Sequence, residues 1–188
     1  MKGTATRGPA PRGTPPRGMA PPGQLLDTRR RGVHLPWLAL SALLIALDQW
    51  TKHLISSNLG SYETRVVLPV FNLVNAQNRG AAFSMFDHDG AWQRWAFSGL
   101  GLGVSVALVL WIARLERSAR LLAGSLALIL AGALGNVIDR LQLGHVVDFL
   151  QVHWGEHYFP AFNVADSAIT VGAAGLLLDA LLSGRHQR

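Results

Sequence analysis

The chain contains no cysteine, which excludes disulfide bonds, cysteine-ligated zinc sites and thiol nucleophiles. Charge is also scarce, because Asp, Glu, Lys and Arg together make up 15% of the 188 residues, whereas soluble domains carry about 25%. Hydrophobic residues account for 49% of the chain. A composition so apolar and so poor in charge is typical of a membrane protein.

Residues 1–34 differ in composition from the rest of the chain. They hold seven Lys and Arg residues against the single acid Asp27, Pro and Gly recur, and no apolar periodicity is present. Such a segment cannot bury enough apolar surface to offset the entropy of ordering it. We therefore expect a disordered basic cytoplasmic tail at 1–34, a membrane domain at 35–184 and a cytoplasmic C-terminus at 185–188.

Four apolar stretches follow the tail, at 36–57, 92–112, 119–138 and 162–183. Each is close to the length of about 20 residues that a helix needs to cross roughly 30 Å of hydrocarbon. The stretch TRVVLPVFNLVNAQN at 64–78 is instead rich in β-forming residues. The sequence predicts an all-α membrane bundle of four transmembrane helices with a small extracytoplasmic β-element.

The basic residues predict how the bundle is oriented. Seven lie in the first 34 residues, three lie at 114–120 and two lie at the C-terminus, which accounts for twelve of the 17. Cytoplasmic segments carry an excess of Lys and Arg. Both termini are therefore expected in the cytoplasm, and the loops at 58–91 and 139–161 are expected outside. Aromatic residues near the outer boundary are expected to anchor the protein in the membrane interface: Trp92, Trp95, Trp154, Tyr158 and Phe159.

Polar residues gather near one depth of the predicted bundle. An ionisable group inside a span costs about 2.5–3.5 kcal/mol on insertion scales, so a shared depth points to function. Structural roles are also open: Asp48 and Lys52 can form an i,i+4 ion pair. Asp139 and Arg140 can cap the end of the third apolar stretch and hold the loop after it, and the asparagines can satisfy helix ends. The residues at this depth are Asp48, Lys52, Asn136, Asp139, Arg140, Asn163 and Asp166, with Asp148 in the intervening loop.

Four blocks of sequence carry a resemblance to a known family. They are DQWTK at 48–52, NRGAAF at 78–83, GNVIDRLQLGHVVDF at 135–149 and FNVADS at 162–167. The chain resembles lipoprotein signal peptidases, also called type II or prolipoprotein signal peptidases. The blocks touch three of the four apolar stretches in order, and the basic tail lies outside the resemblance. Ala131 precedes Gly132 where two glycines are expected, which is a mild departure.

The resemblance implies an aspartyl endopeptidase of the bacterial inner membrane, with its active site near the periplasmic face. Such enzymes remove the signal peptide from diacylglyceryl-modified prolipoproteins and cut before the lipidated cysteine. The implied partners are these substrates, membrane lipids and globomycin-type cyclic peptide inhibitors, without nucleic acid, cofactor or metal. The resemblance implies Asp148 and Asp166 as catalytic residues, and Asp48, Lys52, Asn78, Gly80, Asn136, Asp139, Arg140, Asn163 and Ala165 as substrate-binding or supporting residues.

Two neighbouring carboxyl groups suit peptide hydrolysis. They cannot both ionise easily, so they share a proton and their pKa values separate. The ionised member can act as general base on water, and the protonated member can donate to the leaving nitrogen. The sequence leaves open which aspartate takes which role. We also expect the loop at 78–83 to hold the substrate and to move as it enters and leaves.

Other functions remain as alternatives. A zinc protease is disfavoured because HExxH is absent, and His153 and His157 are expected in a loop without a third ligand. The segment GLGVS at 101–105 lacks the aspartate of a presenilin-type motif. A small transporter or membrane scaffold would use intramembrane charges, but those charges should spread across the whole depth. Gly99 and Gly103 form a GxxxG pattern that we interpret as a helix-packing motif.

Overall fold

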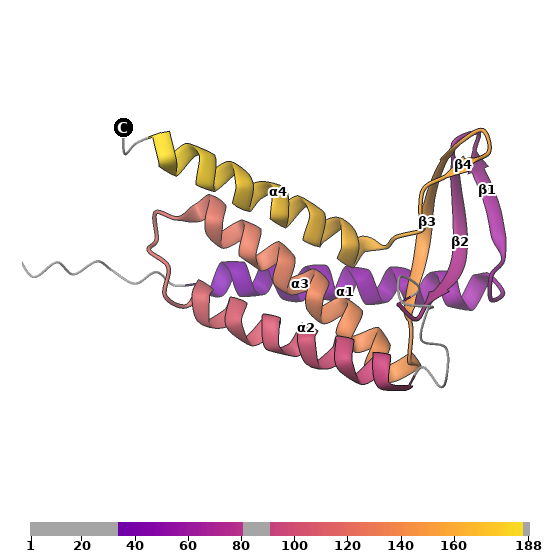
Figure 1. The fold of residues 1–188 in the computed structure, drawn as a ribbon, viewed down its shortest axis with the longest axis horizontal. Coiled ribbons are helices and arrows are strands. Elements are labelled where there is room, and N and C mark those ends of the chain that lie inside the picture. Colours follow the sequence, from indigo (N-terminus) through magenta and orange to yellow (C-terminus); the bar gives the residue numbers. More distant parts are fainter. Residues whose placement is uncertain (1–33, 81–90, 186–188) are drawn as a thin grey trace, which may run out of the picture.

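Long helices and one small sheet make up the computed structural model, which describes residues 34–80 and 91–185 (Figure 1). The helices are α1 (Leu35–Asn58), α2 (Ala91–Ile112), α3 (Arg120–Leu143) and α4 (Val164–Arg185). The predicted tail apart from His34, residues 81–83 of the predicted moving loop and the last three residues lie outside the described ranges.

Three of these helices are long and apolar enough to cross a membrane: Trp92–Ile112, Arg120–Leu143 and Val164–Ser183. Helix α1 is as long as α3, with 24 residues, and it carries the buried charges of Asp48 and Lys52 in its second half. The described chain is therefore mostly helical, with three candidate membrane spans and a small sheet. The fourth predicted span, α1, stays a prediction.

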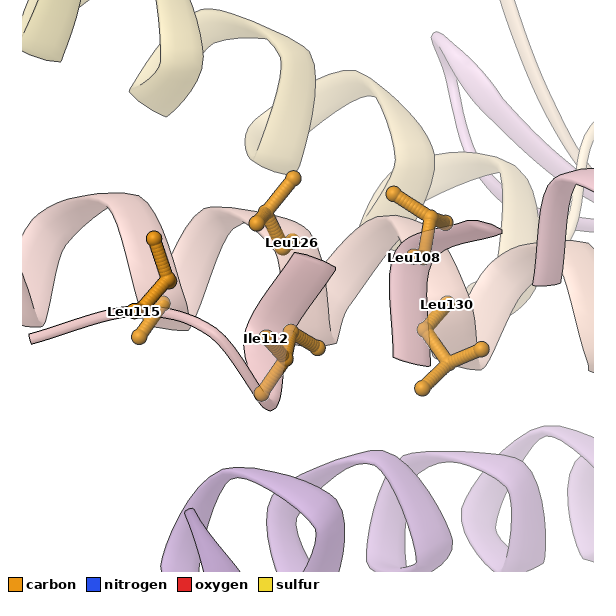
Figure 2. Packing of buried hydrophobic residues seen from close by; sticks show 6 residues of the cluster. Leu108, Ile112, Leu115, Leu126 and Leu130 are labelled. Carbon is orange, nitrogen blue, oxygen red and sulfur yellow. The ribbon is translucent and has the colours of Figure 1, made fainter. Parts of the chain in front are cut away.

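The α2–α3 interface holds an apolar cluster at the end of the bundle away from the sheet (Figures 1 and 2). Ile112 and Leu126 are fully buried there, packed among Leu108, Leu115 and Leu130. Burial of a side chain of this size contributes about 1.5–3 kcal/mol in water, but between lipid-facing helices close packing provides the stabilisation instead. The cluster fixes how α2 lies on α3.

Glycines of α3 allow α4 to approach closely. A Cβ at Gly132 would collide with the carbonyl oxygen of Ala165, and a Cβ at Gly135 would lie 2.7 Å from Asp48 Oδ2. The close approach positions the start of α4 beside α1 and α3. By contrast, a Cβ at Gly99 or Gly103 would meet no described atom within 4 Å. The GxxxG pattern of α2 therefore has no packing partner among the described residues.

The sheet lies where α1 and α3 end and α4 begins (Figure 1). Its strands β1 (Thr64–Leu68), β2 (Phe71–Asn78), β3 (Val146–Trp154) and β4 (His157–Tyr158) pair antiparallel in the order β1-β2-β3-β4. The β1–β2 hairpin confirms the predicted β-element. The placement of Asp148, His153 and His157 in a loop was wrong, because the segment VVDFLQVHW pairs with β2 and then β4.

Candidate active site

Strand pairing brings Asn78 and Asp148 together. Ala76 lies opposite Asp148 in the β2–β3 register, and Asn78 is two residues further along β2. Because side chains two residues apart point to the same face of a strand, Asn78 and Asp148 share one face. The Asn78 amide Nδ2 donates to Asp148 Oδ2 at 2.9 Å, and Asp148 is only 3% exposed.

Asp166 lies in the first turn of α4, and Asn163 immediately precedes that helix. The backbone N–H of Asp166 donates to Asn163 Oδ1 at 2.9 Å, and the backbone N–H of Asn163 donates to Asp166 Oδ2 at 3.2 Å. This reciprocal pair is the capping-box arrangement that satisfies free N–H groups at a helix start. The fold thereby fixes the Asp166 carboxyl at the N-terminus of α4.

Asn163 connects the two aspartates. While its backbone N–H binds Asp166, its side-chain Nδ2 donates to Asp148 Oδ1 at 2.8 Å. A single residue therefore contacts both carboxyl groups. The structure brings Asp148 and Asp166 to one place, from a strand and a helix 18 positions apart in the sequence.

Burial and the negative charge of Asp166 act in one direction on the pKa of Asp148, and the positive charge of Lys52 acts in the other. Burial is the main cause that raises the pKa of Asp148 to about 6, and the neighbouring charge of Asp166 raises it further. The hydrogen bonds from Asn78 and Asn163 act against this rise, because donors favour the ionised carboxylate. A carboxyl group with this pKa can carry a proton near neutral pH.

Lys52 occupies the centre of a buried ion cluster beneath the pair. Its Nζ lies 2.8 Å from Asp48 Oδ2 and 2.9 Å from Asp139 Oδ2, and it donates to Asn136 Oδ1 at 3.0 Å. The predicted pairing of Asp48 with Lys52 is confirmed, and Asp139 joins it. Gln49 also belongs here, since its Nε2 donates to Asp139 Oδ1 at 2.8 Å.

The ion cluster holds the backbone on both sides of the site. Asp48 Oδ1 accepts from the N–H of Ala165 at 2.9 Å, and Asp139 Oδ2 accepts from the N–H of Val147 at 3.1 Å. These N–H groups directly precede Asp166 and Asp148 in the sequence. Asp139 therefore holds the segment after α3, one of its two predicted structural roles, while the end of α3 is capped by left-handed Gly144.

Gly80 sets the direction of the Asn78 amide. Its backbone N–H donates to Asn78 Oδ1 at 2.8 Å, with φ of 98°. Only glycine adopts this conformation without strain. A Cβ would also lie 2.8 Å from the ring of Phe97. Two independent constraints therefore require glycine at this position.

A cavity of about 670 Å³ opens beside Asp148. The Arg140 guanidinium borders it, with its Cζ 5.2 Å from the ring centroid of Phe97 and its Nη1 donating to the backbone oxygen of Asn136 at 3.3 Å. Phe97 was not predicted, and no motif in α2 indicated it. The lining residues include Tyr62, Asn78, Gly80, Phe97, Arg140 and Asp148.

The site therefore brings together nearly every residue that the sequence analysis selected. Asp148 and Asp166 lie close together, and three asparagines surround them. Lys52 joins the buried ion cluster, and the remaining predicted residues line the cavity or take part in the backbone contacts. Among residues 34–80 and 91–185, no group of three or more His, Asp or Glu residues is placed to hold a metal ion. A helical membrane protein with two amide-bound carboxyl groups, one buried and one partly buried, beside a cavity has the features of an aspartyl hydrolase.

Comparison with known proteins identifies the family. The family model of signal peptidase (SPase) II matches residues 40–182. The lipoprotein signal peptidase of Pseudomonas putida is 51% identical over 155 residues, which cover 81% of this chain and 91% of the relative. That of Acinetobacter baylyi is 48% identical over 146 residues, covering 78% and 82%. The chain therefore belongs to the signal peptidase II family, whose members are membrane peptidases.

Solved structures agree with this assignment. A bacterial membrane enzyme solved by the in meso method at 2.3 Å superposes with a TM-score of 0.71 at 27% identity, covering 81% of this chain and 92% of that one. A second such structure, at 1.9 Å, gives a TM-score of 0.70 at 28% identity and covers 78% and 92%. The fold is that of a bacterial membrane enzyme.

Proposed function

We propose that the chain removes the signal peptide from diacylglyceryl-modified prolipoproteins, cutting before the lipidated cysteine, with Asp148 and Asp166 as its catalytic residues. The relatives are named lipoprotein signal peptidases, which supports prolipoproteins as the substrate class. The observation that carries the proposal is the contact of Asn163 with both carboxyl groups beside a cavity. The proposed chemistry requires one bound water to reach both aspartates.

Hydrolysis in this site needs no covalent intermediate. The ionised aspartate takes a proton from water, whose oxygen attacks the scissile carbonyl carbon, and the protonated aspartate donates to the leaving nitrogen. Arg140 borders the cavity and carries a positive charge near both carboxyl groups. It is suited to bind a carbonyl oxygen of the substrate backbone. Each step uses side chains that the fold already holds.

The membrane arrangement that we propose has four spans and the site at the outer face. Helix α1 has enough residues to cross, and its exposed side is apolar, with Leu43, Trp50 and Leu54 at 67%, 60% and 47% exposure. Arg114 and Arg117 lie in the α2–α3 connection, at the end of the bundle opposite the sheet (Figure 1). Because cytoplasmic loops are enriched in Arg and Lys, the sheet end faces the periplasm and both termini face the cytoplasm.

Lipid is then the second partner of the site. Exposed aromatic side chains at the sheet end support its position at the headgroup level, where such rings are favoured: Trp92, Trp95, Trp154, Tyr158 and Phe159 are all more than half exposed. The acyl chains of the substrate would remain in the bilayer while the peptide enters the cavity. We also propose that globomycin-type cyclic peptides occupy the same cavity and compete with substrate.

The test is an in vitro cleavage assay on a diacylglyceryl-modified prolipoprotein. We expect Asp148→Asn and Asp166→Asn each to abolish turnover while remaining folded in detergent. Asp179→Asn is the matched control, because Asp179 lies in α4 far from the site, and it should cleave at the wild-type rate. A chelator should leave the rate unchanged. Turnover retained in either site variant contradicts the assignment of the pair.

A further inference from the structure

Three asparagine amides surround the carboxyl pair, and each points its NH2 group towards a carboxylate. The direction of each amide is fixed, because its oxygen faces a group that can only donate; backbone N–H and ammonium groups have no acceptor lone pair. A reversed amide would place donor against donor. The fixing contacts are Gly80 N–H to Asn78 Oδ1 at 2.8 Å, Asp166 N–H to Asn163 Oδ1 at 2.9 Å, and Lys52 Nζ to Asn136 Oδ1 at 3.0 Å.

Asn136 differs from the other two because a side chain fixes it. Asn163 Nδ2 also reaches Asn136 Oδ1, but at 3.3 Å, and the same amide donates at 2.8 Å to Asp148. The ammonium of Lys52 is therefore the principal anchor of Asn136. In that orientation the Asn136 Nδ2 donates to Asp166 Oδ1 at 2.8 Å.

Lys52 is held tightly enough to impose this orientation. It is 3% exposed, and an ammonium has three N–H donors. Those donors face Asp48 at 2.8 Å, Asp139 at 2.9 Å and Asn136 at 3.0 Å. With three partners for three donors, rotation of the ammonium offers no better arrangement.

The fixed orientation of Asn136 determines the hydrogen-bond surroundings of Asp166. Its Oδ1 faces the Asn136 amide and its Oδ2 faces the backbone N–H of Asn163, so both oxygens meet obligate donors. The carboxyl also stands in the first turn of α4, where the helix favours negative charge. Asp148 also meets a fixed amide at each oxygen, from Asn78 and Asn163. It is nevertheless buried in β3, whereas Asp166 is only partly buried. The surroundings of the two aspartates are therefore unequal.

We propose that Lys52 is a positioning residue of the peptidase reaction, acting through Asn136 to keep Asp166 the ionised member of the pair. This rests on the proposed function, because it assigns roles within the same pair. Asp166 takes the proton from water as the new carbon–oxygen bond forms. Asp148 gives its proton to the amine nitrogen as the carbon–nitrogen bond breaks. Transfer of the proton from Asp166 to Asp148 then restores the starting state.

Removal of Lys52 also changes the electrostatic balance among the other charged groups around the pair. The test therefore separates an effect carried by the Lys52–Asn136 contact from an effect of the Lys52 charge through space. The charged groups come from every neighbouring element: Asp48 and Lys52 on α1, Asp139 and Arg140 on α3, Asp148 on β3 and Asp166 on α4. A through-space effect of the Lys52 charge acts whether or not Asn136 is present. An effect carried by Asn136 disappears when Asn136 is removed.

The experiment is a double-mutant cycle on kcat with Lys52→Met, Asn136→Ala and the double variant, measured across pH with a lipidated prolipoprotein. We expect Lys52→Met to lower kcat about 10–100-fold, as for other groups that orient a site residue, with little change in KM. The acidic limb of kcat should move to higher pH, because Asp166 loses a donor to its ionised form. The double variant should be no slower than Asn136→Ala.

Asn78→Ala provides the matched control, because Gly80 and not Lys52 orients that amide. Its effect on kcat should multiply with that of Lys52→Met. The proposal is overturned if the effects of Lys52→Met and Asn136→Ala on kcat also multiply in the double variant. It is equally overturned if the acidic limb of the kcat profile of Lys52→Met stays at the wild-type pH.

A folding defect in Lys52→Met leaves the question answerable. The same double-mutant cycle can then be run in an Asp139→Asn background. There Lys52→Met removes a positive charge after a negative one has already been removed, and Asn136→Ala is again the second mutation. Failure of the proposed function gives a different pattern, with turnover in Asp148→Asn or Asp166→Asn. If Asp148→Asn and Asp166→Asn are both inactive but the effects of Lys52→Met and Asn136→Ala on kcat multiply, only the positioning role of Lys52 is wrong.

Discussion

Replacement of Asp148 by Asn should change how the stability of the protein depends on pH. Burial raises the pKa of Asp148 from 3.8 to about 6 in the folded protein, whereas in the unfolded chain the ordinary value returns. A carboxyl group whose folded pKa is raised binds its proton more tightly in the folded state. Its stabilising contribution is therefore complete below about pH 4 and is lost as pH rises through about 6.

The magnitude follows from the size of the shift. A difference of about 2 pKa units at about 1.4 kcal/mol each gives roughly 3 kcal/mol. The amide introduced by Asp148→Asn cannot ionise, so the variant lacks this pH-dependent loss. It carries a separate cost of about 1–3 kcal/mol at every pH, because an amide has one oxygen and either Asn78 or Asn163 loses its acceptor.

The measurement is the free energy of unfolding in mixed micelles between pH 4 and pH 8. The wild type should be the more stable protein at pH 4. Between pH 4 and pH 7 the difference from Asp148→Asn should move by about 2–3 kcal/mol in favour of the variant, which cancels or reverses that advantage. Asp179→Asn should follow the wild type. A difference that stays constant across this range would refute the argument that burial of ionised Asp148 is unfavourable.

Two glycine substitutions test the geometry around the pair. Gly80→Ala forces a Cβ to within 2.8 Å of Phe97 at a φ of 98°. The kcat should fall at least about tenfold, because Asn78 loses its orientation. Gly99→Ala is the control: its Cβ would meet no described atom within 4 Å, and the variant should cleave at the wild-type rate. Gly135→Ala places a Cβ 2.7 Å from Asp48 Oδ2 and should lower the melting temperature by several degrees, measured in detergent, because overpacking typically costs about 1–3 kcal/mol.

Much of the fold could be predicted because lipid imposes a length and a polarity on each helix. The stretches at 92–112 and 162–183 match the described helices to within about two residues, and the 64–78 segment forms the expected hairpin. Strand β3 was missed because its pairing partner, β2, lies about 70 residues earlier in the chain. Long-range pairing of this kind leaves no local periodicity to detect.

The site was predictable in its members but not in its connections. Charged and amide side chains near one depth of a membrane are informative because they are costly there. The sequence cannot show which amide faces which carboxylate, since that depends on backbone N–H groups from other elements. The link from Lys52 through Asn136 to Asp166 is such a case, as is the role of Gln49 beside Asp139.

The position of the pair at the junction of helices and sheet has a physical reason. Within a span, lipid requires every backbone N–H to be used inside its own helix, so free donors exist only where elements start or end. The site uses such donors repeatedly, from Val147, Asn163, Ala165 and Asp166. A carboxyl pair placed one turn deeper in α4 would meet N–H groups already bonded to carbonyls four residues earlier. Its charge would then depend on side-chain donors alone.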